Sequence, residues 1–367
     1  MGNLFSEGRK PATDSSKTEY APFDSGTSRR RFLKALAVAG ASAVLPASGL
    51  LGQTMSGGNR VVTGRIDVHH HLYPPDYMKA VGISMPRTWT PQTSLDKMDA
   101  AGIATSILSP VQVVVKDTMS GKDQKTRDLV RMNNEYTAKC VRDNPKRFGS
   151  FAALPMLDTD GSLKEIAYAY DTLKTDGIGL WTSYMDKWVG SPDFWPIYEE
   201  LNRRNAVVFY HPSHNACCRN ISDQSGIIDF DIDTTRAIDS MLFTGTLSKY
   251  PNVRHIWSHA GGGFSVLAAR EIDDYPKNRA DKVPNGVEYE IKKMYFDTAH
   301  AGKVPTIDAL RDIVPISQIL YGSDVPLREY PLTDVPLDEY PRFSEDDWKA
   351  INRGNSERLF PRLKEKA

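Results

Sequence analysis

Short apolar runs alternate with amphipathic segments along most of the chain. The stretch 158–177, for example, begins with acidic residues, keeps apolar residues three and four positions apart and ends at Gly177, which is typical of a helix. Strands that alternate with helices favour a parallel sheet. Eight apolar runs are expected to be strands: 65–71, 103–110, 148–155, 177–184, 206–213, 253–260, 293–300 and 318–326.

Eight parallel strands are the number that closes a barrel. The predicted fold class is therefore α/β, a (β/α)₈ TIM barrel of residues 61–367, whose length of roughly 300 residues suits that fold. A doubly wound open sheet is the alternative. It would require a glycine-rich phosphate loop after the first strand, where the chain instead reads HHHLYPPDYM.

Residues 1–60 have the layout of an export signal and linker. The segment 28–34 reads SRRRFLK, and an apolar run, ALAVAGASAVL, follows it. That run is too short to span a bilayer, and the pair Arg29 and Arg30 closely resembles the twin-arginine motif. We predict export by the twin-arginine machinery to the periplasm, with no membrane span in the mature chain. A disordered basic tail is the alternative.

Composition narrows the classes of partner. Lysine plus arginine equal aspartate plus glutamate at 46 each, so the overall charge gives no reason to expect nucleic acid or an anionic membrane. A small-molecule ligand is therefore expected. The cysteines do not indicate a disulfide scaffold, because Cys217 and Cys218 are adjacent and Cys140 stands alone. The oligomeric state stays open, with a homodimer among the alternatives.

Histidines gather at the carboxyl ends of the predicted strands. Of the eight histidines, only His255 sits earlier within a strand. Active sites of barrels form at this end, where the loops after the strands begin. The first strand ends in His69, His70 and His71. Because successive side chains of a strand point to opposite faces, His69 and His71 are expected to face the barrel mouth and His70 the helices.

Two further strand ends complete a candidate metal site. His211 ends the fifth predicted strand, and Asp324 ends the eighth, which neighbours the first in a closed barrel. Together with His69 and His71 they offer three imidazoles and one carboxylate. This set suits an open catalytic site for one divalent ion, with Zn²⁺ preferred and Mn²⁺ as the alternative. Asp67 is expected one layer deeper on the same face, where it would orient a ligand imidazole.

His259 ends the sixth predicted strand, in the phrase SHAGGG. Histidine exchanges a proton near neutral pH, so His259 is expected to act as general acid or base or to polarise the substrate. A structural, hydrogen-bonded histidine is the alternative. The glycines after it would let the backbone approach a ligand closely. His300 and His214 also stand near strand ends, and His214 lies beside two cysteines.

Five phrases carry a family likeness: IDVHHH, YHP, SHAGGG, YGSDVP and GNSERLF. With them, over residues 65–360, the chain resembles the amidohydrolase-2 branch of the metal-dependent hydrolase superfamily, the group of 2-amino-3-carboxymuconate semialdehyde decarboxylase. It is most similar to 6-methylsalicylate decarboxylase-type proteins. The resemblance implies that the metal ligands are His69, His71, His211 and Asp324 and that His259 is the catalytic histidine.

The resemblance also implies a reaction, the metal-dependent decarboxylation of a small aromatic or unsaturated carboxylic acid such as a hydroxybenzoate. Asp324 would be both ligand and proton donor, and His259 would polarise an oxygen. A hydrolase of a lactone or amide that uses metal-bound hydroxide is the alternative, and a non-catalytic periplasmic binding protein is the second. Lys187 comes too late to be the bridging lysine of binuclear hydrolases, which favours one metal ion.

Candidate substrate contacts are Arg236 or Arg87 for the carboxylate, and Trp89, Tyr184 and Phe296 for an aromatic wall. Core packing is the alternative for each aromatic residue, and a solvated surface position is the alternative for each arginine.

The chain departs from the family pattern after Asp324. It has Val325 where the family usually has an aromatic residue, and the phrase DVPLREYP is followed by a second copy, DVPLDEYP. This proline-rich insertion is expected to lie over the pocket, with an ordinary surface loop as the alternative.

Overall fold

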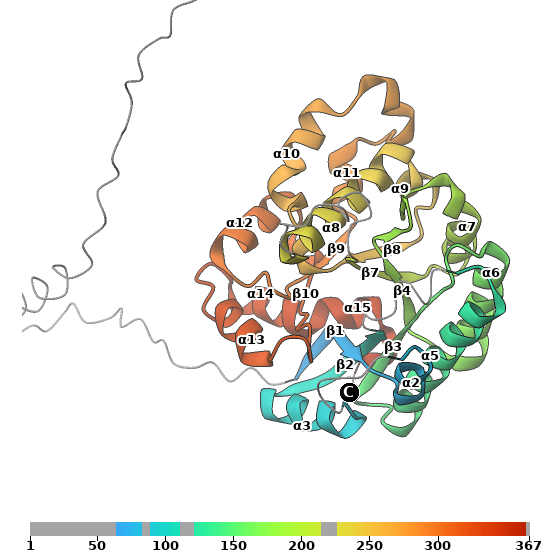
Figure 1. The fold of residues 1–367 in the computed structure, drawn as a ribbon. Helices are drawn as coiled ribbons and strands as arrows, with labels where there is room; N and C mark the ends of the chain where they lie inside the picture. Colours follow the sequence, from blue (N-terminus) through green and yellow to red (C-terminus); the bar gives the residue numbers. More distant parts are fainter. Residues whose placement is uncertain (1–63, 83–88, 111–120, 214–225, 365–367) are drawn as a thin grey trace, which may run out of the picture. The chain divides into compact units, whose positions relative to one another are not determined.

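Eight parallel strands form the centre of the fold (Figure 1). The computed structural model describes residues 64–82, 89–110, 121–213 and 226–364. The predicted export signal, Arg87, His214, Cys217 and Cys218 lie outside the described residues. The strands are β1 (Arg65–Leu72), β2 (Ile103–Pro110), β3 (Phe148–Ala152), β4 (Gly177–Trp181), β7 (Val207–His211), β8 (Arg254–Trp257), β9 (Tyr295–Asp297) and β10 (Ile319–Leu320), in that order in the sheet.

Backbone hydrogen bonds close the sheet between its last and first strands. The N–H of Val68 donates to the carbonyl of Tyr321 at 3.0 Å, and the N–H of His71 donates to the carbonyl of Val325 at 2.7 Å. His70 and Val325 also form a parallel bridge. The eight predicted strands and the predicted (β/α)₈ barrel are thereby confirmed. Several strands end earlier than expected because their last predicted residues already belong to the loops that carry the polar side chains.

Helices cover the outside of the barrel (Figure 1). They are α2 (Pro75–Ala80), α3 (Pro91–Ala101), α5 (Gln124–Asp143), α6 (Thr159–Tyr168), α7 (Trp195–Arg203), α8 (Gly226–Thr244), α9 (Thr246–Lys249), α10 (Phe264–Asp274), α11 (Val287–Ile291), α12 (Val304–Ile313), α13 (Tyr330–Asp338), α14 (Glu345–Lys349) and α15 (Asn355–Leu359). The helix predicted in 158–177 is α6, capped by Asp158, whose carboxylate accepts the N–H of Gly161 at 3.1 Å. Among the described residues, no helix is both long and apolar enough to cross a membrane.

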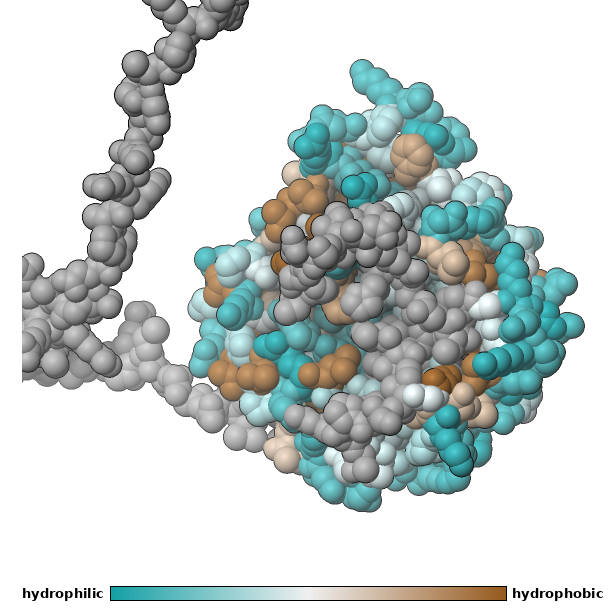
Figure 2. Space-filling model, in the orientation of Figure 1, coloured by the Kyte–Doolittle hydropathy of each residue, from teal (hydrophilic) through white to brown (hydrophobic). Residues whose placement is uncertain are grey.

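Apolar side chains fill the inside of the barrel beneath the polar strand ends. This interior cluster includes Phe151 and Phe209, whose rings stack with their centroids 5.2 Å apart. Its other members are Ile66, Val68, Ile107, Val207, Ile256, Leu320, Leu359, Phe360 and Leu363. Hydrophilic residues cover most of the described surface visible in Figure 2, and the hydrophobic patches on it are separate. Burial of the apolar residues therefore supplies a rigid frame for the strand ends.

The second copy of the duplicated phrase forms part of a helix, whereas most of the first copy is turn and irregular structure. This second copy lies in and just after α13, whose Tyr330, Thr333 and Leu337 are buried at helical spacing. Asp334 and Asp338 of α13 both pair with the fully buried Arg65 at the start of β1. These ion pairs and buried side chains dock the second copy on the outside of β1, so the second copy does not cover the pocket. The first copy begins at Asp324 itself, and for that copy the expected place over the pocket stays a prediction.

Candidate metal centre and active site

The imidazoles of His69 and His71 meet the carboxylate of Asp324 at the carboxyl end of the barrel. The two Nε2 atoms lie 3.2 Å apart, and Asp324 Oδ1 lies 3.2 Å from His69 Nε2 and 2.9 Å from His71 Nε2. His211 Nε2 is 4.0 Å from the same oxygen. Ligand atoms of a tetrahedral Zn²⁺ site with bonds of 2.0–2.1 Å are about 3.3 Å apart. His69, His71 and Asp324 therefore have about the spacing that one divalent ion requires, and His211 lies somewhat farther away.

His259 joins this cluster from the loop after β8. One possible ligand atom from each of His69, His211, His259 and Asp324 lies within 4.8 Å of the other three. The set that contains His71 instead of His259 is tighter around Asp324 Oδ1. His259 Nε2 is 4.0 Å from the second carboxylate oxygen, Oδ2. This geometry favours His71 as a ligand and leaves His259 beside the second carboxylate oxygen.

Hydrogen bonds determine which ring nitrogen faces the centre. His69 Nδ1–H donates to Asp297 Oδ2 at 2.8 Å, and His211 Nδ1–H donates to the carbonyl of Pro212 at 2.9 Å. Their Nε2 atoms therefore point to the centre. Nε2 of His211 and of His259 are buried and have no hydrogen-bond partner among the described residues. Buried polar atoms without partners are costly, so the arrangement fits a bound cation or substrate.

Burial and carboxylates set the charges of the cluster. Burial opposes protonation of His69, but Asp297 and Asp324 outweigh it and raise the pKa of His69 to about 10. Burial lowers the pKa of His211 well below its usual value and lowers the pKa of His259 to about 3. Burial raises the pKa of Asp324, but His69 and hydrogen bonds from the neighbouring imidazoles hold it well below its usual range. The cluster thus pairs an ionised carboxylate with neutral imidazoles and one site of positive charge.

Metal binding is expected to release about one proton per ion near pH 8. Because the pKa of His69 is about 10 in the protein without metal, His69 must lose a proton before its Nε2 can bind an ion. Affinity should therefore rise about tenfold per pH unit as the pH approaches 10. Calorimetric titration in buffers of different ionisation enthalpy counts the protons. Release of none would contradict the placement of His69 between two carboxylates.

Asp297, at the end of β9, orients the centre and was missed in the sequence. Its Oδ2 accepts from the ring of His69, and its Oδ1 accepts the backbone N–H of His259 at 2.9 Å. One buried carboxylate therefore holds both a candidate ligand and the loop of the candidate catalytic histidine. An acidic residue near the carboxyl end of a predicted strand was the available signal.

Asp297→Asn is expected to weaken metal affinity by about 10- to 100-fold, the usual effect of losing the partner that orients a ligand imidazole. The amide keeps the size of the side chain but removes the negative charge facing His69 Nδ1–H. Competition with a chelator of known affinity measures the change. Asp312→Asn, at an exposed position of α12, is the matched control, and an equal loss in both variants would contradict the role of Asp297.

His70 and Asp67 lie on the outer side of β1. His70 Nε2 is 2.8 Å from Ser94 Oγ, and His70 Nδ1 is 3.2 Å from the hydroxyl of Tyr330, which also donates to Asp67 Oδ2 at 3.3 Å. The prediction that Asp67 orients a ligand imidazole is wrong, because the register of β1 shifts between Asp67 and His70 and reverses the alternation. Asp67 instead accepts the backbone N–H of His69 at 3.0 Å.

The backbone is left-handed at three residues of the site. The φ angles are 55° at His259, 57° at His300 and 69° at Asp324. Residues other than glycine adopt this conformation at a cost of about 1–3 kcal/mol each, and such residues concentrate at functional sites. The N–H of Asp324 donates to the carbonyl of His69 at 2.8 Å, which holds the strained turn in place. Strain and candidate chemistry therefore coincide.

Two glycines allow close packing around the site. A Cβ at Gly322 would lie 2.9 Å from the Cβ of His69. At Gly262, where φ is 63°, a Cβ would collide with the backbone of Asp231 in α8. The glycines after His259 were expected to let a ligand approach the backbone, but at Gly262 the space is taken by α8.

His300 and Arg328 connect Asp324 to solvent. His300 Nε2 is 2.7 Å from Asp324 Oδ2, and Arg328 Nη1 donates to His300 Nδ1 at 3.0 Å. A guanidinium only donates, so His300 Nδ1 accepts and His300 Nε2–H donates to Asp324. The His300 side chain is 44% exposed, whereas that of Asp324 is 7% exposed. The sequence did not single out Arg328, which lies in the first copy of the duplicated phrase.

The predicted aromatic wall consists of packed core residues. Trp89 is buried, and its Nε1–H donates to Ser94 Oγ at 3.0 Å. Tyr184 is fully buried between two aromatic neighbours, and Phe296 is fully buried in the core. Arg236 is exposed on α8. The contacts of the three aromatic residues support the packing alternative, and those residues do not join the cluster around Asp324.

Comparison with known proteins places the chain in a family. A model of the amidohydrolase family matches residues 66–362. The chain is 34% identical over 325 residues to decarboxylase macB of Penicillium terrestre, an alignment that covers 82% of this chain and 96% of that protein. It is 34% identical over 322 residues to the 6-methylsalicylic acid decarboxylase of Penicillium expansum, with 82% and 97% covered.

A solved structure has the same fold. Dihydroxybenzoic acid decarboxylase of Polaromonas sp. JS666, with bound manganese and the inhibitor 2-nitroresorcinol, superposes with a TM-score of 0.69 at 21% identity. The superposition covers 83% of this chain and 98% of that chain. Together with the family match and the two relatives, it confirms the resemblance inferred from the sequence. The chain belongs to the amidohydrolase family, in the branch that contains the 6-methylsalicylic acid decarboxylases.

Proposed function

We propose that the protein is a metal-dependent decarboxylase that removes carbon dioxide from a small hydroxylated aromatic carboxylic acid. The observation that carries the proposal is the convergence of His69, His71, His211 and Asp324 beside the neutral, unpartnered ring of His259. Relatives that are decarboxylases, one of them acting on 6-methylsalicylic acid, support the substrate class.

The four converging side chains would hold one divalent ion, which as a Lewis acid stabilises negative charge on substrate oxygens. Imidazole nitrogens and carboxylate oxygens are ligands that Zn²⁺ takes in proteins, so Zn²⁺ is our first choice. Mn²⁺ is the second choice, because the dihydroxybenzoic acid decarboxylase of Polaromonas binds manganese. Metal analysis of the purified protein, followed by reconstitution with each ion, decides between them.

Decarboxylation replaces a carboxylate with a proton at a ring carbon, so the site must deliver one proton. Asp324 is ionised at rest, and its Oδ2 accepts the Nε2–H of His300. Asp324 would take the required proton from solvent and hand it to the ring carbon, and the hydrogen bond from His300 would hold its Oδ2 in position. His259 would hydrogen-bond the phenolic oxygen of the substrate through its Nε2, which has no partner among the described residues.

Incubation of the metal-loaded protein with hydroxybenzoates and with lactones tests the proposal. Release of carbon dioxide from at least one hydroxybenzoate is the expected result. Opening of a lactone ring without release of carbon dioxide would favour the hydrolase. Tight binding of one compound without turnover of any would contradict both enzymes and favour a binding protein.

We also propose that the twin-arginine machinery exports the protein to the periplasm, on the strength of the phrase SRRRFLK. Fractionation of a bacterial host that expresses the full chain should find the protein in the periplasm. Arg29→Lys combined with Arg30→Lys should keep it in the cytoplasm. An unchanged distribution would contradict the proposal. Light scattering of the exported protein distinguishes a monomer from a homodimer.

A further inference from the structure

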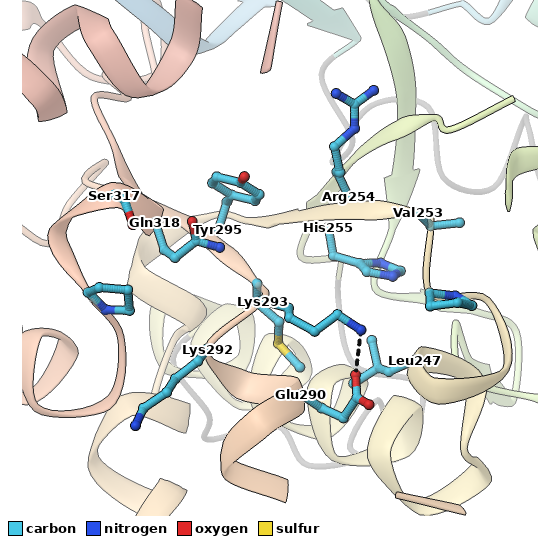
Figure 3. A pocket seen from close by; sticks show the side chains of 13 residues that line it. Leu247, Val253, Arg254, His255, Glu290, Lys292, Lys293, Tyr295, Ser317 and Gln318 are labelled. Carbon is cyan, nitrogen blue, oxygen red and sulfur yellow. Dashed lines mark hydrogen bonds and ion pairs between the residues drawn. The ribbon is translucent and has the colours of Figure 1, made fainter. Parts of the chain in front are cut away.

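A second cavity lies at the amino-terminal ends of β8 and β9, the opposite end of these strands from the candidate metal centre (Figure 3). Its volume is about 310 Å³. The residues that line it are Leu247, Pro251, Val253, Arg254, His255, Glu290, Lys292, Lys293, Met294, Tyr295, Pro315, Ser317 and Gln318. None of the residues assigned to the metal centre is among them, so this cavity is separate from the proposed active site.

The ring of His255 lines this cavity, and its Nε2 is a hydrogen-bond donor. The residue is 6% exposed, and its Nε2 is buried without a partner among the described residues. His255 Nδ1 is 2.9 Å from the hydroxyl of Tyr210, which lies 3.2 Å from the hydroxyl of Tyr198. Each of the two hydroxyl protons finds an acceptor only if Tyr198 donates to Tyr210 and Tyr210 donates to His255 Nδ1. The hydrogen of the neutral imidazole is then on Nε2.

Charged residues around the cavity favour an anion. Lys293 pairs with the buried Glu290 at 3.1 Å, and Glu290 also accepts from Ser248 Oγ at 2.9 Å, which satisfies this carboxylate. The guanidinium of Arg254 donates to the carbonyls of Leu359 and Asn205, and Lys292 pairs with Glu288, so Lys293 is the lining cation that acts on His255. Burial, and then the nearby Lys293, lower the pKa of His255 to about 3. His255 therefore stays a neutral donor at physiological pH, with the ammonium of Lys293 nearby.

Apolar side chains make up much of the remaining wall, which also includes Tyr295, Ser317 and Gln318. Leu247, Val253 and Met294 line the cavity with the rings of two prolines. A buried donor, a neighbouring ammonium and apolar side chains are complementary to a ligand with one anionic end and an apolar body. We propose that this cavity is a second binding site, for a small aliphatic or aromatic monocarboxylate whose carboxylate accepts from His255 Nε2 and faces Lys293.

Calorimetric titration of the metal-loaded full chain with hexanoate tests this site. Hexanoate has the carboxylate and an apolar body but lacks the ring and phenol of the proposed substrate. His255→Phe is expected to weaken hexanoate binding by about tenfold or more, the loss expected for a hydrogen bond to a charged group. Lys292→Met is the matched control. The ammonium of Lys292 pairs with Glu288 at 2.6 Å and points away from His255 in Figure 3, so hexanoate binding should not change.

Two further probes separate the parts of the proposal. 1-Hexanol, which lacks the charge, and inorganic phosphate, which lacks the apolar body, should both bind more weakly than hexanoate. Equal binding of hexanol, or stronger binding of phosphate, would overturn the assignment to a monocarboxylate.

Failure of hexanoate to bind, or equal affinity in the protein and in His255→Phe, would overturn the site itself. If His255→Phe does not fold, Leu247→Trp fills the cavity and leaves the bond between His255 and Tyr210 intact, and it should cause a similar loss of binding. Unchanged hexanoate binding in Leu247→Trp would likewise overturn the site.

Discussion

Asp324→Asn is expected to lower kcat by about a thousandfold, within the range attributed to a positioned general acid or base. Asparagine keeps the shape of the side chain, but it cannot carry the negative charge that three imidazoles surround, and it cannot pass a proton to carbon. Steady-state release of carbon dioxide measures kcat. Metal bound per chain, measured on the same samples, shows how much of the loss follows from a weakened ligand set.

The chain provides a matched control for this substitution in its own repeat. Asp334 occupies the position of Asp324 in the second copy of the phrase DVPL, but it lies in α13 and pairs with Arg65 at 3.2 Å. Asp334→Asn should leave kcat unchanged and lower only the stability of the fold. Loss of activity in both variants to the same degree would show that Asp324 acts through the fold rather than through the reaction.

The regular part of the site could be predicted because it depends only on the alternation of side chains along a strand and on the order of the strands in the barrel. A strand alternates its faces, and parallel strands bring their carboxyl ends together, so His69, His71, His211 and Asp324 were expected to meet before any distance was known. The distances of 2.9–4.0 Å to Asp324 Oδ1 are the outcome of that order. The eight strands followed from the same reasoning, because each is a short apolar run between helices.

The irregular part could not be predicted. One shift of register in β1 moves Asp67 to the outer side, and no residue in the run RIDVHHH marks the shift. Trp89, Tyr184 and Phe296 are equally suited to a core and to a ligand pocket, so composition does not separate the two. Helix α13 was not predicted, because Pro331 and Pro336 argue against a helix in this segment. Its Tyr330, Thr333 and Leu337 nevertheless recur at the spacing of a buried helical face.

Alanine variants of the three consecutive histidines of β1 should differ in metal binding and in stability. His69→Ala and His71→Ala each remove one of four groups around the proposed ion, so stoichiometric metal binding should be lost in both. His70→Ala should keep the metal, because the ring of His70 faces Ser94 and Tyr330 on the outer side. It should instead lower the free energy of unfolding by about 1–3 kcal/mol, since two buried hydrogen-bonding groups lose their partner.

Metal content per chain and denaturant unfolding, measured on the same three variants, give the two readouts. Equal loss of metal in all three would contradict the division of this strand into an inner pair and an outer ring. Loss of metal in His70→Ala alone would show that the ion binds on the outer side of β1, which would contradict the proposed ligands. The expected pattern needs both the shift of register before His69 and regular alternation after it. It therefore tests the local backbone of β1 as directly as it tests the ligands.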